Sequence, residues 1–119
     1  MRVYVAGPYS CDPMPDAFSN MRRGVRASVE LFLDGHTPFS PWLDWMYWMV
    51  LADGEDIPKE RIYEYSLDWL EVCDCVYVLS GWERSPGTQN EIKWAKKLGM
   101  PVFFAREDFD AWVRKEAGE

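Results

Sequence analysis

The residue best suited to catalysis by its type and position is Glu91, which ends the segment SPGTQNE at residues 85–91. Glu91, Ala95 and Leu98 are spaced i, i+4 and i+7, so on a helix Glu91 heads the apolar stripe that faces the interior. A carboxylate placed there is partly desolvated, which raises its pKa and makes it available as a nucleophile or base. A structural interpretation stands beside this one, because Thr88 and Glu91 have the spacing of a capping box.

The same segment predicts an anion site at the start of a helix. Ser85, Gly87 and Thr88 precede or begin the helical pattern, where unpaired backbone amides and the helix dipole attract a group such as a 5′-phosphate. Ser85 before Pro86 is equally typical of a plain N-cap. We therefore take these three residues as candidate substrate-binding residues, with the capping role as the alternative.

Tyr4 lies on a short apolar run, residues 2–6, that Gly7 and Pro8 end. The run predicts a buried strand followed by a turn. A phenol near the end of such a strand can hydrogen-bond a carboxylate at the same edge, although a core tyrosine is the simpler interpretation. Gly7 allows close approach of the backbone to a ligand, or simply a tight turn. Tyr4 is thus a candidate catalytic residue, and Gly7 and Pro8 are candidate substrate-binding residues.

Strands and helices alternate along the chain. Apolar runs predict strands at 2–6, 75–79 and 101–105, and Pro38 confines a fourth, at 37–40, to a sheet edge. Helical patterns cover residues 16–34, 42–52, 58–72, 88–98 and 107–116. Such alternation predicts a parallel sheet with helices on both faces, and ligands of these folds bind beyond the carboxyl ends of the strands. The loops at 7–10 and 81–87 meet that description.

Composition limits the remaining possibilities. A chain of 119 residues suits one domain, residues 1–119, and its net charge of −7 disfavours binding to a nucleic-acid polymer. No apolar stretch approaches the roughly 20 residues of a membrane span, and no leader precedes the first strand. Three cysteines and one histidine form no metal-ligand spacing, so we expect no metal and no cofactor. We expect a cytoplasmic protein.

Several of these segments occur in the same order in a known enzyme family. They are VYVAGP at 3–8, LDWL at 67–70 before Cys73 and Asp74, SxGxxxE at 85–91 and AxxLGMPV at 95–102. With them the chain resembles the nucleoside 2-deoxyribosyltransferases and their relatives, the 2′-deoxynucleoside 5′-monophosphate N-glycosidases. It also resembles the compact versions of this fold often carried by bacteriophages.

The resemblance implies an α/β fold, a flavodoxin-like or Rossmann-like three-layer sandwich with a parallel sheet of four to five strands. It implies cleavage of the N-glycosidic bond of a nucleoside or its 5′-monophosphate, by hydrolysis or by transfer to another base. Glu91 would be the nucleophile, Tyr4 would orient it, and Ser85 with the amides around Gly87 would hold the 5′ group. Because the family completes its pocket from a neighbouring subunit, a homodimer or larger homo-oligomer is implied, with residues 42–48 as the candidate surface.

One position departs from the family pattern. The family usually has an aspartate three residues before the position of Trp69, where this chain has Ser66. Asp68 lies two residues later, which on a helix moves it about 200° around the axis, so it replaces that aspartate only if the helix ends early. Two alternatives to an enzyme follow: a nucleotide-binding module that lacks the chemistry, or an interaction protein that uses its tryptophan-rich segment.

Overall fold

Four parallel strands form the centre of the molecule. A computed structural model describes residues 1–9 and 13–119, so Ser10 of the predicted 7–10 loop lies outside the described residues. The strands are β1 (Arg2–Ala6), β2 (Thr37–Phe39), β3 (Cys75–Val78) and β4 (Val102–Phe103), in the order β2-β1-β3-β4. All three strand pairs are parallel, and β2 with its Pro38 is at the edge, as predicted. The order reverses direction at β1, which places a topological switch point between β1 and β3.

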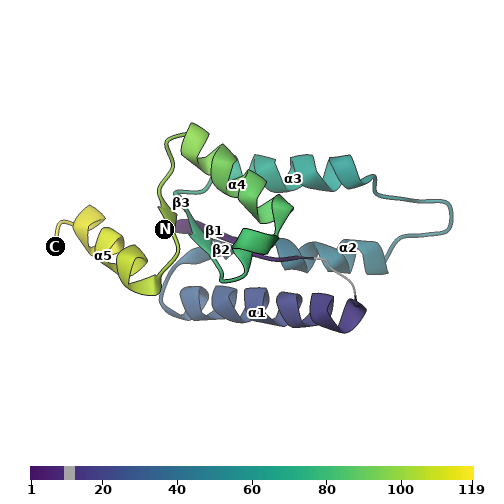
Figure 1. The fold of residues 1–119 in the computed structure, drawn as a ribbon, viewed down its shortest axis with the longest axis horizontal. Coiled ribbons are helices and arrows are strands. Elements are labelled where there is room, and N and C mark those ends of the chain that lie inside the picture. The colour runs from purple at the N-terminus through teal and green to yellow at the C-terminus, as the bar shows by residue number, and fades with distance from the viewer. Residues whose placement is uncertain (10–12) are drawn as a thin grey trace.

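Helices cover both faces of this sheet (Figure 1). The helices are α1 (Met14–Leu33), α2 (Trp45–Met49), α3 (Lys59–Glu71), α4 (Pro86–Lys97) and α5 (Arg106–Glu116), with short 3-10 helices η1 (Pro41–Asp44) and η2 (Trp82–Arg84). Side chains of α1 and α5 share one core cluster with the sheet, and those of α3 and α4 share the other. The predicted three-layer α/β fold of the flavodoxin-like type is therefore confirmed, with four strands.

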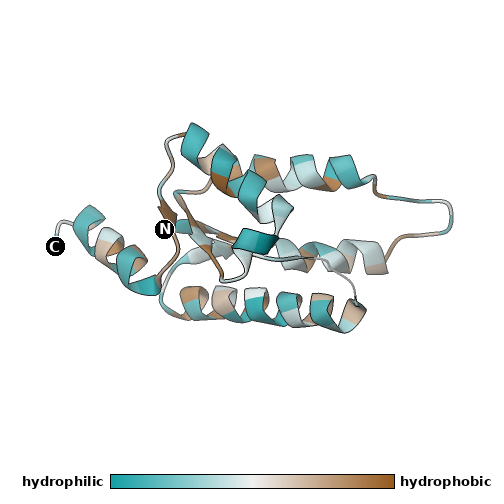
Figure 2. Cartoon of the chain, viewed as in Figure 1, coloured by the Kyte–Doolittle hydropathy of each residue, from teal (hydrophilic) through white to brown (hydrophobic). Residues whose placement is uncertain are grey.

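Alternation along β1 divides its side chains between the two cores. Val3 and Val5 pack with α1 and α5, whereas Tyr4 and Ala6 pack with α3 and α4. All four are buried, as expected for a central parallel strand that has helices on both faces. Figure 2 shows the matching colour pattern, with hydrophobic strands inside and helices of mixed hydropathy around them. This register brings the hydroxyl of Tyr4 to the α4 side of the sheet.

The tryptophan-rich segment differs from its prediction. Instead of one helix over 42–52, the chain forms η1 and then the five-residue helix α2. Trp42 is a core residue: its indole fills the space beside Gly24, where an added Cβ would lie 2.3 Å from the ring, and its Nε1 donates to the Pro8 carbonyl at 3.1 Å. Large apolar side chains of the following turn are exposed, namely Leu43, Met46, Tyr47, Trp48, Met49 and Val50.

None of the helices in the described parts of the chain has the length and apolar character that crossing a membrane requires.

Candidate functional site

Glu91 and Tyr4 face each other between α4 and the sheet. The Glu91 residue keeps some exposed surface, but its Oε2 atom and the Tyr4 hydroxyl are both inaccessible to solvent. Neither atom makes a hydrogen bond of standard geometry within the described residues, although the two groups are close enough for the Tyr4 hydroxyl to stabilise the charged carboxylate. A buried polar group left in this state costs about 1–3 kcal/mol, so such pairs are rare in proteins and are often functional.

Burial controls the ionisation of both groups. Loss of solvent raises the pKa of Glu91 to about 7, and the Tyr4 hydroxyl opposes this by favouring the charged carboxylate. Burial, and then the charge of Glu91, raises the pKa of Tyr4 well above its usual value. The phenol therefore remains a neutral donor beside a carboxyl that is about half ionised at neutral pH.

The helix start shows that Glu91 is not a cap. Helix α4 begins at Pro86, and Ser85 is its N-cap: the Ser85 Oγ accepts from the Thr88 amide at 3.4 Å and lies 2.8 Å from the Thr88 Oγ1. The capping-box interpretation of Thr88 and Glu91 is therefore wrong, because Glu91 lies nearly two turns inside the helix. The prediction that Leu98 faces the interior was also wrong, because Leu98 is 47% exposed at the helix end.

The loops that follow β1 and β3 lie against each other at the switch point. The Leu79 amide donates to the Ala6 carbonyl at 2.8 Å, which extends the pairing of the two strands. A Cβ added to Gly7 would lie 3.1 Å from the Leu79 Cβ, and one added to Gly81 would lie 3.2 Å from the Pro8 ring. Gly81 also has a φ of +92°, which other residues rarely adopt. These glycines let both loops approach the carboxyl edge beside α4.

The N-terminus of α4 retains a donor for an anion. Ser85 and Thr88 satisfy each other, so the predicted N-cap is confirmed, while their role in substrate binding stays a prediction. Within the described residues the Gly87 amide has no acceptor, as is usual for the first turn of a helix. The Tyr63 hydroxyl lies 3.2 Å from where a Gly87 Cβ would be. A side chain at position 87 would therefore crowd the Tyr63 hydroxyl, and glycine leaves that contact open.

The structure does not bring Asp68 to this cluster. Asp68 is exposed on α3, and no hydrogen bond or ion pair engages it in the part of the chain that is described. Ser66, on the inner side of α3, lies beside the Tyr4 hydroxyl and favours its ionised form. The two residues thus follow the helical geometry that the sequence predicts, with the serine inside and the aspartate outside.

Asp44 is an acidic residue at this edge that the sequence analysis missed. It is only 7% exposed, it accepts a hydrogen bond from the Tyr9 hydroxyl, and burial raises its pKa. Its charge also raises the pKa of Tyr65 on α3. One signal was available in the sequence: Asp44 is the single acidic residue in the otherwise aromatic and apolar segment 41–50.

Aromatic rings connect Asp44 with the Glu91 pair. Phe39 of β2 stacks on Tyr4, with ring centroids 5.5 Å apart, and also contacts Tyr65 at 6.2 Å. Tyr65 in turn contacts Tyr47 of α2. The side chains between the two acids are therefore aromatic, and an aromatic surface of this kind can pack against a planar organic group.

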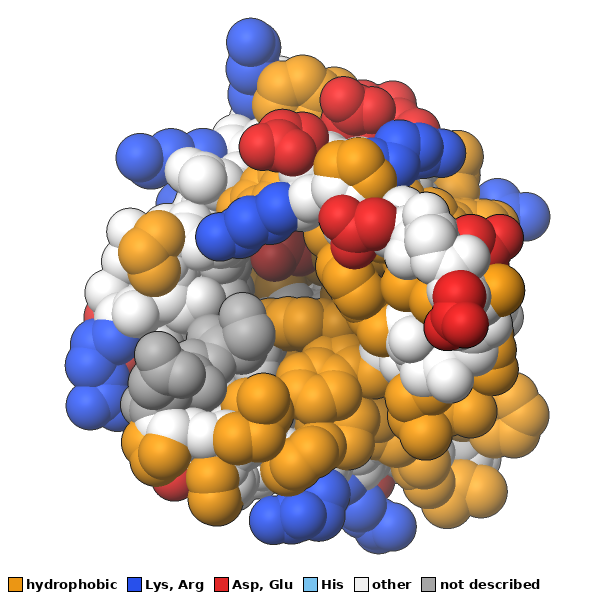
Figure 3. All heavy atoms as spheres, turned by 90° about the vertical axis from the view of Figure 1, so that its right-hand side faces the viewer, with side chains coloured by type: hydrophobic (Ala, Val, Ile, Leu, Met, Phe, Trp, Pro, Cys, Tyr) orange, Lys and Arg blue, Asp and Glu red, His pale blue; other side chains and the backbone are white. Residues whose placement is uncertain are grey.

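Figure 3 looks onto the side of the molecule toward which β1 runs in Figure 1. A hollow opens in the middle of this face, with hydrophobic side chains around it and an acidic side chain inside it. Within the described residues, no group of three or more His, Cys, Asp or Glu side chains is arranged to hold a metal ion.

Comparison with known proteins gives a family and a fold. Residues 1–105 match a family described as a domain of unknown function (DUF7768). The structure is similar to that of a 2-deoxyribosyltransferase from Bacillus psychrosaccharolyticus, with a TM-score of 0.63 and 19% sequence identity, over 86% of this chain and 69% of that one. No curated protein matches the chain in sequence. At this identity the likeness establishes the fold.

The ionisation of Glu91 predicts an unusual pH dependence of stability. The pKa of about 7 in the folded protein exceeds the usual value, so the folded state binds this proton more tightly than the unfolded state does. The contribution of this proton to the free energy of unfolding is fully present below the usual glutamate pKa and is lost as the pH rises through about 7. At pH 8, burying the charge costs roughly 3 kcal/mol.

Glu91→Gln should therefore be more stable than the parent protein at pH 8, by up to roughly 3 kcal/mol, and equal to it near pH 4. Denaturant unfolding at both pH values measures this, with Glu64→Gln at an exposed position of α3 as the control. A stability difference between parent and Glu91→Gln that does not change with pH would contradict the assignment.

Proposed function

We propose that this chain, which belongs to the DUF7768 family of domains of unknown function, cleaves the N-glycosidic bond of a deoxynucleoside or its 5′-monophosphate. Cleavage would occur by hydrolysis or by transfer of the sugar to another base. The observation that carries the proposal is the unpaired carboxyl of Glu91, buried beside Tyr4 at the switch point. The fold shared with a 2-deoxyribosyltransferase supports it.

In the proposed reaction, the ionised carboxylate of Glu91 attacks the anomeric carbon. The carbon–nitrogen bond breaks, its electron pair leaves with the base, and the sugar becomes an ester of Glu91. Water then adds to the anomeric carbon, or a second base does, and the carboxylate is released. Tyr4 directs its hydroxyl at the carboxylate and holds it in position, while the apolar surroundings limit hydration of the nucleophile.

The substrate would lie across the carboxyl ends of β1 and β3. We place the 5′ hydroxyl or phosphate at the Gly87 amide, with Ser85 and Thr88 beside it and the Gly7 and Pro8 loop along the sugar. A helix N-terminus accommodates an anion by its amides and its dipole, so this corner requires no lysine or arginine. The base would then extend toward the aromatic rings of Phe39 and Tyr65.

The leaving base needs a proton, and we assign its donor as Asp44 rather than Asp68. Burial raises the pKa of Asp44, which keeps more of it protonated than an exposed aspartate. Asp44 also lies on the aromatic side of the site, where the base would be. Asp68 is exposed on the outer side of α3.

One observation favours a second candidate, a nucleotide-binding module without activity. Ser66 occupies the inner position of α3 beside Tyr4, and a serine is no general acid at neutral pH. The module would keep the aromatic surroundings and the anion corner but would lack proton transfer to the base. Calorimetry that shows nucleotide binding, with no base released over many hours, would favour it over the enzyme.

The first prediction of this proposal concerns base release and its pH profile. On incubation with deoxynucleosides and their 5′-monophosphates, with and without a second free base, chromatography should show free or exchanged base. Because the reaction needs the ionised carboxylate of Glu91 and the protonated carboxyl of Asp44 together, kcat/KM should have a bell-shaped pH profile, with the ionisation of Glu91 near pH 7 as one of its two limbs. Glu91→Gln should lower the rate at least about a thousandfold.

The control for that experiment is Glu64→Gln, which removes an exposed carboxylate of α3 and should keep full activity. Unchanged base release by Glu91→Gln would refute the nucleophile, and a profile with no limb near pH 7 would refute its raised pKa.

A matched pair of variants tests the proton donor. Asp44→Asn should slow release of a natural base about 10²- to 10⁴-fold, the usual contribution of a general acid, while Asp68→Asn changes little. A deoxyribosyl substrate with a 4-nitrophenolate leaving group needs no protonation, so its cleavage by Asp44→Asn should be nearly normal. Equal losses on both substrates would mean that Asp44 is only structural, and a loss confined to Asp68→Asn would return the role to Asp68.

We also propose that the chain works as a homodimer or larger homo-oligomer. The predicted 42–48 surface needs correction because Trp42 is in the core, so the candidate surface is the exposed apolar part of η1 and α2 and the residue after it, including Met46 (57%), Met49 (75%) and Val50 (76%). Apolar surface of this kind on a small chain is typical of an interface.

Met49→Glu should shift the chain from dimer to monomer in sedimentation equilibrium, because it places a charge in the proposed contact. Leu98→Glu, at an exposed apolar position on α4, is the matched control and should leave the mass unchanged. A parent protein that remains monomeric at about 0.1 mM would refute the assembly.

A further inference from the structure

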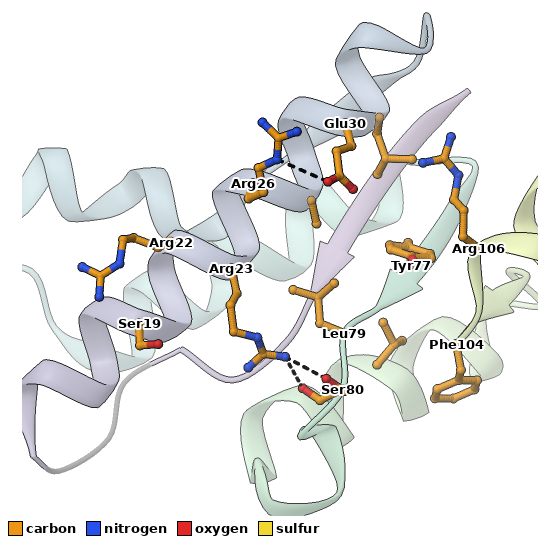
Figure 4. A pocket seen from close by; sticks show the side chains of 13 residues that line it. Ser19, Arg22, Arg23, Arg26, Glu30, Tyr77, Leu79, Ser80, Phe104 and Arg106 are labelled. Carbon is orange, nitrogen blue, oxygen red and sulfur yellow. Dashed lines mark hydrogen bonds and ion pairs between the residues drawn. The ribbon is translucent and has the colours of Figure 1, made fainter.

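A cavity lies on the opposite face of the sheet from Glu91 (Figure 4). Its volume is about 580 Å³, and it runs between α1 and the residues that join β4 to α5. Tyr77 and Leu79 form part of its wall, and both belong to the core cluster of α1 and α5. Tyr4 packs in the other cluster. The sheet therefore separates this cavity from the proposed glycosidase site.

Arginines dominate the lining. Arg22, Arg23 and Arg26 come from α1 and Arg106 comes from the start of α5, whereas Glu30 is the one carboxylate that lines the cavity within the described residues. Arg26 is four residues from Arg22 and three from Arg23, and both spacings place side chains next to each other on a helix surface. Such a concentration of positive charge contrasts with the net charge of −7 of the whole chain.

The ion pairs within the protein leave part of this charge uncompensated. Arg22 has no hydrogen bond or ion pair to any described residue. Arg23 reaches across to Ser80 and donates to its carbonyl at 2.8 Å and its Oγ at 2.9 Å, and both acceptors are neutral. Within the described residues, no carboxylate therefore neutralises the charge of these two guanidinium groups.

The other two arginines are paired with carboxylates. Arg26 pairs with Glu30 at 3.2 Å, and Arg106 pairs with Asp34 and Asp110. Even when these three carboxylates are counted against the four arginines, a net positive charge remains at the cavity.

Apolar and aromatic surface completes the cavity. Tyr77 is half-buried, and Phe104 is 45% exposed at the rim. Figure 4 shows the Tyr77 ring between Arg106 and Leu79, with the Arg23 side chain extending to Ser80 at the end of β3. Guanidinium groups bind phosphate oxygens in pairs, and an aromatic ring next to them can receive a planar base.

We propose that this cavity is a second binding site, for a phosphate-bearing anion, separate from the site at Glu91. The shared chemistry is the phosphate group, which Arg22 and Arg26 would contact from α1. Its source is either a nucleotide, whose base would lie on Tyr77 and Phe104, or an inorganic phosphate.

Titration calorimetry at low salt tests the site with inorganic pyrophosphate and with adenosine diphosphate. Both should bind, more weakly as salt is added. Arg22→Glu and Arg26→Glu should each lower the affinity for pyrophosphate at least tenfold, because each replaces an attraction by a repulsion. Arg61→Glu, an exposed position of α3 outside the cavity, is the matched control and should bind like the parent. Circular dichroism confirms that each variant is folded.

Tighter binding of the diphosphate nucleotide than of pyrophosphate would identify the nucleotide as the source, and equal affinities would identify the inorganic anion. Equal losses in Arg22→Glu and Arg61→Glu would overturn the proposal, as would the absence of any binding at 10 mM. Loss of pyrophosphate binding in Ser85→Ala, with normal binding in both cavity variants, would place the anion at α4 instead. Glu91→Gln should bind pyrophosphate normally, so failure of the glycosidase proposal leaves this test intact.

Discussion

Burying an ionisable carboxyl group without a counter-charge costs free energy. Helix α4 buries such a group at Glu91. No lysine or arginine pairs with this carboxyl, and its Oε2 atom has no hydrogen-bond partner within the described residues. An arginine in the same place would lower the pKa and weaken the carboxylate as a nucleophile, because a tightly paired anion is a poor one. At the start of the same helix, the side chains of Ser85 and Thr88 satisfy each other, so the unpaired carboxyl is not part of a more general loss of hydrogen bonds there.

The rest of the site depends on how α4 is held. Ser85 caps the helix N-terminus through its contacts with Thr88, so Glu91 is not needed as a cap. Thr88, Ile92 and Ala95 form the buried stripe that fixes the helix against the sheet. That packing turns Glu91 toward Tyr4, whose position follows from the alternation of β1. Local capping and sheet register together determine the geometry of a pair of residues 87 positions apart.

Much of this arrangement follows from the sequence alone. Unbroken apolar runs identified three of the strands, Pro38 identified the edge strand, and the spacing of Glu91 and Ala95 predicted the burial of the carboxyl. Periodicity could not show that Trp42 turns into the core, because the space that it fills lies beside Gly24, a residue of another helix. The same applies to Asp44, whose importance comes from Tyr9 and Tyr65, side chains 35 and 21 positions away, rather than from any local pattern.

Ser66 lies where the family that the chain resembles usually has an aspartate, and an acid at that position would change the electrostatics as well as the proton supply. Two carboxylates beside Tyr4 would repel each other, and the pKa of one of them would rise further, which would leave less of the nucleophile ionised at neutral pH. With Ser66 there, burial is the main cause that raises the pKa of Glu91. In the proposed reaction, the acid that protonates the leaving base must therefore lie farther from Glu91. Asp44 satisfies that requirement: burial raises its pKa, and its charge is not among the causes of the pKa shift at Glu91.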